Sequence, residues 1–218
     1  MIEYTIKIRL KSPALIGSGS GYGALVDADV VYDDLGIPYI PAKRIKGCLL
    51  DSAKDVKAMF KLAGVNLKLN IEKTFGKEGQ QKEAPVYFEN MVINQYDENS
   101  QWLKYFLHAK DYSGILSKDV IIDMFTEERH QTTIADDGVA LKNSLRTMRL
   151  VKKDHEFHGK IQINDDSAQQ VITNTLIAAC MNFRRFGTKR NKGLGEVECE
   201  LFDNDKMLSI EKQMEGLL

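Results

Sequence analysis

Residues 36–47 read Gly-Ile-Pro-Tyr-Ile-Pro-Ala-Lys-Arg-Ile-Lys-Gly and predict an extended segment that runs directly into a helix. The α region is disfavoured for a residue before proline, so the segment before Pro41 is expected to be extended. Proline is tolerated at the start of a helix, because its missing N–H would have no partner there. From residue 42 to about 63, apolar residues recur every three or four positions, up to Gly64. This spacing predicts an amphipathic helix.

The remaining patterns predict a chain of mixed α and β structure. Residues 2–10 alternate between apolar and polar, which predicts a half-buried strand. Other patterns predict strands at 25–33, 85–94 and 196–202, a hairpin of 145–151 with 156–163, and helices at 99–110, 117–127, 167–184 and 205–218. The order fits an α+β, ferredoxin-like (RRM-like) fold with a helix-covered antiparallel sheet. We expect one domain over 1–218, with insertions at about 64–84 and 97–128.

Length and composition bound the class of protein. The chain has 218 residues, a hydrophobic content of 43% and a formal net charge of −1. This hydrophobic content is sufficient for a packed core. No apolar run approaches the roughly 20 residues of a membrane span, and the first residues do not resemble a secretory signal. Cys48, Cys180 and Cys199 are far apart and suggest neither a disulfide framework nor a zinc site. We therefore expect a cytoplasmic protein with no membrane partner.

The near-zero net charge hides an uneven distribution. Of the 30 lysines and arginines, 13 fall in three windows without any acidic residue, at 43–46, 141–153 and 184–195, and the rest of the chain carries 17 basic and 31 acidic residues. A face that follows a phosphate backbone needs such a concentration of cations. Each window alone is equally compatible with an ordinary solvated surface.

Two of these windows have further features that favour a polyanion. Lys43, Arg44 and Lys46 occupy the first turns of the predicted helix, where cations oppose the helix dipole. The stretch 187–195 places glycines among lysines and arginines, which lets backbone N–H groups approach phosphates closely. It matches neither the P-loop nor the dinucleotide-binding pattern. We interpret it as a loop for single-stranded RNA or DNA, with a plain surface turn as the alternative.

Several short motifs, taken in order, resemble the RAMP superfamily, the RNA-binding subunits of CRISPR effector complexes. The stretch from Ile40 to Gly47 is similar to the superfamily's strand-to-helix signature, and residues 187–195 are similar to its C-terminal glycine-rich loop. Residues 26–31, 74–76 and 133–146 resemble the backbone (Cas-seven-like) subunit of type III effectors in particular. Asp29 departs from that pattern, since it stands where the family often has a proline.

The resemblance implies a subunit that polymerises along a guide RNA, with a β-hairpin thumb at about 141–163 that kinks the guide–target duplex. It implies as partners guide RNA, complementary target RNA, copies of this chain or homologous backbone subunits, and other CRISPR effector subunits. In target-cleaving members an aspartate before the Ile-Pro motif promotes metal-dependent cutting, and Asp27 matches it by position. We therefore predict that Asp27 is catalytic and holds a divalent cation such as Mg²⁺. A solvated carboxylate is the alternative.

The predicted RNA contacts come from the basic windows and the glycine-rich loop. They are Lys43, Arg44, Lys46, Arg146, Arg149, Gly187, Lys189, Arg190, Lys192, Gly193 and Gly195. Met148, in the predicted thumb, is the candidate for an apolar wedge between bases. Trp102, Tyr105 and Phe106 have helical spacing and are expected in the core rather than in a base-stacking platform.

Two alternative functions are compatible with the same sequence. A guide-processing endoribonuclease of the superfamily would work without metal and place a catalytic histidine near the N-terminus, whereas the first histidine of this chain is His108. His130 is the residue that this activity would use here, with a plain surface histidine as the alternative. A non-catalytic capping or structural subunit would bind RNA or protein only. The target-cleaving backbone subunit and the non-catalytic subunit share a role in antiviral defence and differ in whether the chain is an endoribonuclease.

Overall fold

A computed structural model describes residues 2–19, 21, 25–77, 79, 85–109, 112 and 114–209. Its centre is an antiparallel sheet with the strand order β2-β6-β1-β7-β8, and β3 also pairs with β6. The strands are β1 (Ile2–Leu10), β2 (Val86–Phe88), β3 (Val92–Ile93), β6 (Glu156–Ile163), β7 (Val197–Asp203) and β8 (Lys206–Leu208). Helix α1 (Ala42–Leu62) follows β1, and α5 (Gln169–Asn182) follows β6. With the order β2-β6-β1-β7, this is the ferredoxin-like arrangement that the sequence predicts.

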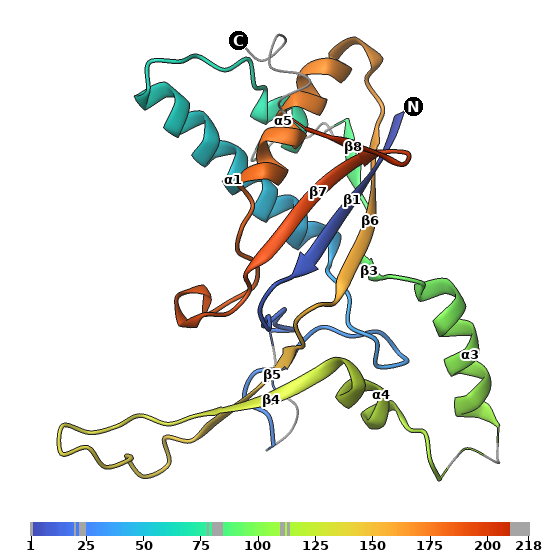
Figure 1. Ribbon diagram of the computed structural model, residues 1–218, viewed down its shortest axis with the longest axis vertical. Coiled ribbons are helices and arrows are strands. Elements are labelled where there is room, and N and C mark those ends of the chain that lie inside the picture. Colours follow the sequence, from blue (N-terminus) through green and yellow to red (C-terminus); the bar gives the residue numbers. More distant parts are fainter. Residues whose placement is uncertain are drawn as a thin grey trace.

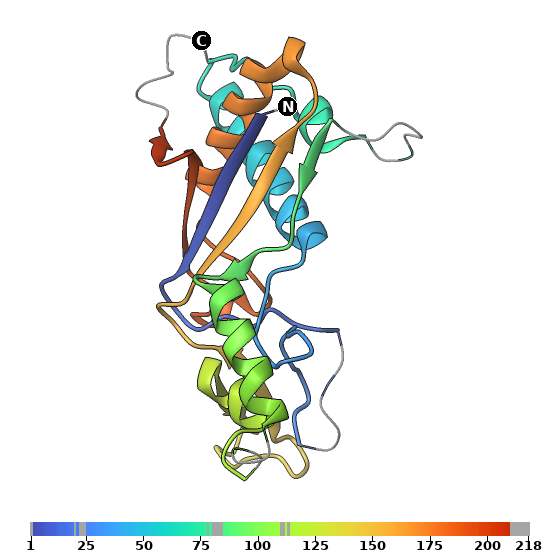
Figure 2. The same cartoon turned by 90° about the vertical axis from the view of Figure 1, so that its right-hand side faces the viewer.

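One face of the sheet carries the core, and α1 and α5 cover it (Figure 1, Figure 2). The alternation of β1 buries Tyr4, Ile6, Ile8 and Leu10 on that face, as a half-buried strand requires. One polar contact joins β1 to α5, and another joins α1 to α5. The hydroxyls of Tyr4 and Thr173 lie 3.0 Å apart, and the Ser52 hydroxyl donates to the Ala179 carbonyl over 2.7 Å. The central strand and both helices thus form one packed body.

A second group of elements lies at the end of the sheet where β1 ends. The strands β4 (Thr126–Gln131) and β5 (Arg146–Val151) pair as an antiparallel hairpin that extends away from the sheet (Figure 1). Helices α3 (Tyr96–His108) and α4 (Lys118–Phe125) lie at the same end of the molecule. The short elements are α2 (Ile71–Phe75) and the 3-10 turns η2 (Asp166–Ala168) and η3 (Arg190–Lys192). No helix in the described part of the chain has the length and apolar character needed to span a bilayer.

The predicted pairing of 145–151 with 156–163 is wrong, although both strands exist. β5 pairs with β4, whereas β6 pairs with β1 in the main sheet. The turn at Asp154 is a corner between the two sheets, because Leu10 exchanges backbone hydrogen bonds with Asp154 and His155. The alternating buried residues of β6 fill the main core instead of facing β5. The thumb-like hairpin therefore spans 126–151 and not 141–163.

Other differences also follow from tertiary contacts. Residues 25–33 form isolated bridges instead of a regular strand, and 85–94 splits into β2 and β3. Residues 206–208 pair with β7 as β8 rather than beginning a helix, and the predicted tail beyond 209 lies outside the described residues. Trp102 and Tyr105 are 57% and 62% exposed, so the expectation of a core position is wrong for both.

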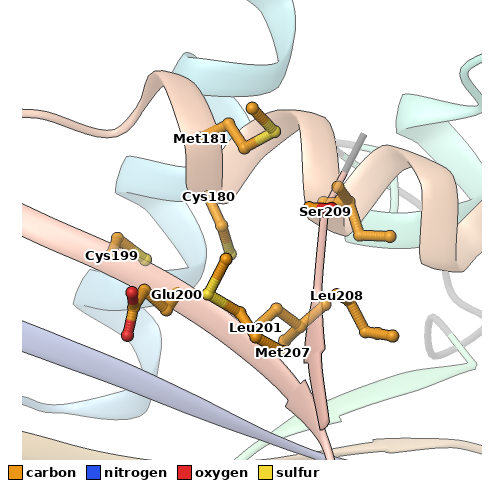
Figure 3. A pocket seen from close by; sticks show the side chains of 9 residues that line it. Cys180, Met181, Cys199, Glu200, Leu201, Met207, Leu208 and Ser209 are labelled. Atoms are coloured by element: carbon orange, nitrogen blue, oxygen red, sulfur yellow. The ribbon is translucent and has the colours of Figure 1, made fainter. Parts of the chain in front are cut away.

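A small cavity between α5 and the β7–β8 pair is lined by Cys180 and Cys199 (Figure 3). Its volume is about 70 Å³, and Cys180, Cys199 and Met207 contribute sulfur atoms to its wall. Burial is the main cause that raises the pKa of the Cys199 thiol well above its usual value, and the neighbouring Cys180 adds to it. Both cysteines are free thiols, and burial keeps the Cys199 thiol protonated at neutral pH.

Candidate nucleic-acid interface

The first turns of α1 present the basic residues of the Ile-Pro segment. Pro41 precedes the helix in an extended conformation, and the first helical N–H, of Ala42, donates to the Asn90 side-chain oxygen over 2.8 Å. Asn90 lies between β2 and β3, so a remote residue satisfies a helix end that has no acidic side chain in its first turn. Periodicity gives no signal for this contact. Lys43, Arg44 and Lys46 remain at least partly exposed around it.

The glycine-rich loop owes its shape to close backbone packing. Gly195 has a φ of +71°, and a Cβ there would collide with the Phe186 carbonyl. Its N–H donates to the Pro13 carbonyl over 2.9 Å, while the Phe186 N–H donates to the Gly195 carbonyl over 2.7 Å. At the other end of the loop, Gly187 has a φ of +83°, and the Thr188 N–H donates to the Leu15 carbonyl over 3.1 Å. The loop is therefore anchored at both ends, and the basic residues between its ends remain accessible.

The basic loop and the start of α1 lie near each other. Burial raises the pKa of the Cys48 thiol, while Arg190 and Arg44 act in the opposite direction through their positive charge. Arg44 stands one turn before Cys48 on the same face of α1. Arg184, Arg185 and Arg190 also line a surface hollow of about 300 Å³ together with Cys48. The windows at 43–46 and 184–195 thus contribute to one surface.

The same loop reaches the β4–β5 hairpin. The Lys192 ammonium donates to the Gln131 side chain over 3.4 Å, and the Lys189 ammonium lies 3.9 Å from the Met148 sulfur. Arg146 begins β5 with a side chain that is 61% exposed. The three basic windows, which are distant in sequence, are therefore neighbours around the junction of sheet and hairpin. Such a concentration of cations is the electrostatic pattern of a phosphate-binding face.

Asp27 is exposed beside the start of β5. Its backbone N–H donates to the Thr147 carbonyl over 2.9 Å, and its Oδ2 accepts the Thr147 N–H over 2.8 Å. Its Oδ1 lies 3.9 Å from the Arg146 Nε. Among the described residues no three metal-ligating side chains cluster, so an all-protein metal cage is not formed there. A single accessible carboxylate does fit Mg²⁺, which keeps several waters and accepts phosphate oxygens as ligands.

Two predicted RNA-facing residues of β5 are buried instead. Arg149 is only 8% exposed and pairs with the carboxylate of Asp29, which is 4% exposed. Met148 is 1% exposed, so it lies in the core and not at a wedge position. The reason is that the segment around Ala28 packs beside β5 and forms a parallel bridge with Met148. The predictions that Arg149 contacts RNA and that Met148 is a wedge between bases are therefore wrong, because both side chains are buried.

Exposed aliphatic side chains gather at the tip of the hairpin. Four aliphatic residues there are each at least half exposed: Ile134, Val139, Leu141 and Leu145. The tip is held by its own backbone, since the Ala135 N–H donates to the Val139 carbonyl over 2.8 Å and the Leu141 N–H donates to the Thr133 carbonyl over 2.9 Å. The exposed tip therefore has a defined shape.

The histidines divide between the hairpin and the sheet. His130 is exposed on β4, and its Nδ1 lies 3.0 Å from the Thr147 hydroxyl, one residue from Arg146. His155 packs against the ring of Phe125. Burial is the main cause that lowers the pKa of His155, and the positive charge of Lys152 acts in the same direction. His158 pairs with Glu156 over 2.7 Å on β6.

Comparison with known proteins assigns the family. The family model of the RAMP superfamily matches residues 7–198. The chain belongs to the RAMP superfamily. This match includes the strand-to-helix segment, Asp27 and the glycine-rich loop. No curated protein matches this RAMP chain in sequence.

Two solved structures are similar to this RAMP chain in fold. One is a chain of the type III-B Cmr-beta complex bound to cognate target RNA, with a TM-score of 0.67, 14% identity, and coverage of 92% of this chain and 97% of that chain. The other is a chain of the type III-B Cmr-beta complex in its apo state, with a TM-score of 0.68, 13% identity, and coverage of 93% and 98%. These TM-scores and coverages show a common fold over nearly the whole length of both chains, and at this low identity they show the fold alone.

Proposed function

We propose that this chain is a guide-RNA-binding backbone subunit of a type III CRISPR interference complex. The observation that carries the proposal is the meeting of three basic windows at the junction of sheet and hairpin in a RAMP-superfamily fold. The similarity to chains of a type III-B complex supports the type of assembly. Its partners are guide RNA, target RNA, copies of itself or homologous backbone subunits, and other effector subunits.

The parts of the site divide the work of binding. Lys43, Arg44 and Lys46 at the start of α1 and the cations of the 187–195 loop neutralise the guide backbone. The β4–β5 hairpin crosses the guide–target duplex, and the exposed aliphatic tip, with Leu145 and Val139, provides the apolar wedge between bases. Arg146, at the end of β5 nearest the tip, lies beside Asp27, and we expect it to contact the target strand.

Salt dependence tests the binding face. Arg190→Ala with Lys192→Ala removes two exposed cations, so the plot of log affinity for single-stranded RNA against log salt should flatten by about 0.7 for each phosphate that the protein no longer neutralises. Fluorescence anisotropy over a range of KCl concentrations measures this slope. The matched control is Lys57→Ala with Lys61→Ala, in the second half of α1, which should leave the slope unchanged. Equal slopes for both double variants would contradict the proposed RNA face.

The second part of the proposal is that Asp27 promotes cutting of the target RNA. A divalent ion such as Mg²⁺ would be held by Asp27 together with water and phosphate oxygens, and would supply charge stabilisation at the scissile phosphate. Thr147 fixes one carboxylate oxygen, which leaves Oδ1 directed toward the Arg146 side of the surface. In-line cutting depends mainly on such placement of groups around the phosphate.

Asp27→Asn separates binding from cutting. In the complex assembled on a guide, this variant should bind target RNA within about twofold of the wild type and lose Mg²⁺-dependent cutting, because only the charge at one position changes. Asp34→Asn, in the turn before α1, is the control. Target cutting at the wild-type rate would exclude a catalytic Asp27, and an absence of cutting by the wild-type complex would favour the non-catalytic structural subunit.

The guide-processing alternative has one observation in its favour, the position of His130 beside Thr147 at the same surface. It predicts cleavage of a guide-precursor RNA without metal, and loss of that cleavage in His130→Ala. Incubation with a precursor RNA in EDTA decides between the two activities.

A further inference from the structure

A buried ion pair lies two residues from Asp27. Arg149 Nη1 is 3.2 Å from Asp29 Oδ1 and 3.1 Å from Oδ2, with both side chains less than a tenth exposed. The carboxylate of Asp29 also accepts the Val30 N–H over 2.8 Å and the Tyr32 hydroxyl over 3.3 Å. On its other side, Arg149 Nη2 lies 3.6 Å from Glu128 Oε1 of β4. The pair thus joins three segments of the chain.

The pair belongs to a short contact between residues 27–29 and residues 147–149, which we call the joint. In the joint, the Asp27 N–H donates to the Thr147 carbonyl, and the Arg149 N–H donates to the Ala28 carbonyl over 3.0 Å. Ala28 and Met148 form the only parallel bridge among the isolated bridges of the described residues. The exposed carboxylate of Asp27 lies at one end of the joint and the ion pair at the other. Both described contacts of the Asp27 carboxylate come from β5.

The backbone contacts alone would hold this register weakly. A bridge of this length has few hydrogen bonds, and a shift by one residue would exchange them for similar ones. The same shift would separate Asp29 from Arg149 and leave two uncompensated charges in a buried place, which is strongly unfavourable. Buried polar pairs are known to specify register in this way, often without adding net stability over apolar residues.

We propose that the Asp29–Arg149 pair is a register lock that positions the Asp27 carboxylate beside the start of β5. The proposal rests on the proposed function, because it assigns two positioning residues to the cutting by Asp27. It also accounts for the burial of Arg149 in a basic window whose other members are exposed or partly exposed. Movement of the hairpin is then transmitted to Asp27 through β5, because the Asp27 carboxylate and the ion pair are both held by residues of that strand.

A double variant tests the lock without leaving a buried charge alone. Asp29→Leu with Arg149→Met replaces the pair by apolar side chains and should retain the fold, as shown by circular dichroism and a cooperative melt. Affinity for guide RNA should stay within about twofold. Target cutting by the assembled complex should fall by about 10- to 100-fold, since a displacement near 1 Å costs this much. The cuts should also spread to neighbouring nucleotides, which a merely structural role would not cause.

A control variant, a graded variant and a second measurement make the result specific. Glu3→Leu with Lys160→Met removes another ion pair, on the outer face of the sheet, and should leave rate and cut positions unchanged. Arg149→Lys retains the charge but loses the second nitrogen that reaches Glu128, so an intermediate rate is expected. Amide hydrogen exchange of the segments 26–31 and 145–150 should accelerate by about tenfold or more in the double variant, with β1 unaffected.

The outcomes separate this proposal from the function on which it rests. Wild-type rate, cut positions and exchange in the double variant would overturn the lock. Absence of cutting by the wild-type complex would overturn the catalytic role of Asp27, and hydrogen exchange at the joint would then decide whether the pair holds the register. Faster exchange confined to the joint supports the lock, and unchanged exchange rejects it.

Discussion

The ferredoxin-like sheet and the β4–β5 hairpin hold their registers by different means. In the sheet, β1 pairs with β6 over eight residues and with β7 over six, and the alternating apolar side chains enter one continuous core. A slip by one residue would expose all of them. Strand β5 of the hairpin instead meets residues 27–29 through a few hydrogen bonds and one ion pair. Many weak contacts tolerate single changes, whereas a joint with few contacts depends on each of them.

The largest expected effect is at the joint. Arg149→Ala leaves the buried Asp29 carboxylate without its partner, which should lower the free energy of unfolding by about 3–5 kcal/mol. Urea denaturation measures this change. Arg146→Ala removes an exposed arginine of the same strand and should cost less than about 1 kcal/mol. Similar losses for both arginines would show that the joint has no special dependence on the ion pair.

The next largest effect is expected in the glycine-rich loop, residues 187–195. Gly195→Ala combines an unfavourable positive φ with a clash against the Phe186 carbonyl, so it should destabilise the protein by about 1–3 kcal/mol. Gly193→Ala has a similar φ of +73° with open space around the new Cβ, so it should lose only about 1 kcal/mol. The difference between the thermal melts of the two variants isolates the cost of the clash at Gly195, because both positions have a similar φ. A larger loss for Gly193→Ala would contradict the packing of the loop.

The smallest effect is expected in the sheet half, at the start of α5. Hydrogen bonds from Ser167 and from the Lys73 ammonium lower the pKa of Asp165 to about 2. Because the folded-state pKa is below the unfolded value near 4, this contribution to stability is present above pH 4 and is lost as the pH falls toward 2. The stability difference between wild type and Asp165→Asn, from urea unfolding at each pH, should shrink over that range. A difference independent of pH would contradict the assignment.

Most elements were predictable from local pattern, and most errors concern partners. The bounds of β1, α1 and β6 agree with the sequence prediction within a residue, because periodicity directly reports which face is buried. The charge pattern alone suggested that the basic windows share one face. It did not indicate that they would lie together near Cys48 and Gln131. Asn90, which satisfies the start of α1, had no signal at all, since its contact spans 48 residues.

The burial of Arg149 shows the same limit at the candidate site. A window of five cations without an acid is typical of an exposed surface, and four of its members are exposed or partly exposed. The fifth finds its counter-ion 120 residues earlier in the chain. Trp102 and Tyr105 show the opposite error, since their helical spacing indicates a common face but not whether another element covers it.

The sequence by itself determined the strands and helices of the core, the segregation of charge and the motifs of the RAMP superfamily, because each depends on residues close together in the chain. Only the tertiary structure decided that β5 pairs with β4, that Asp27 is held by Thr147, and that Arg149 belongs to Asp29 rather than to RNA. The physical reason is that alternation and charge specify what kind of partner a residue needs. Which residue fills that need depends on how segments far apart in sequence pack together.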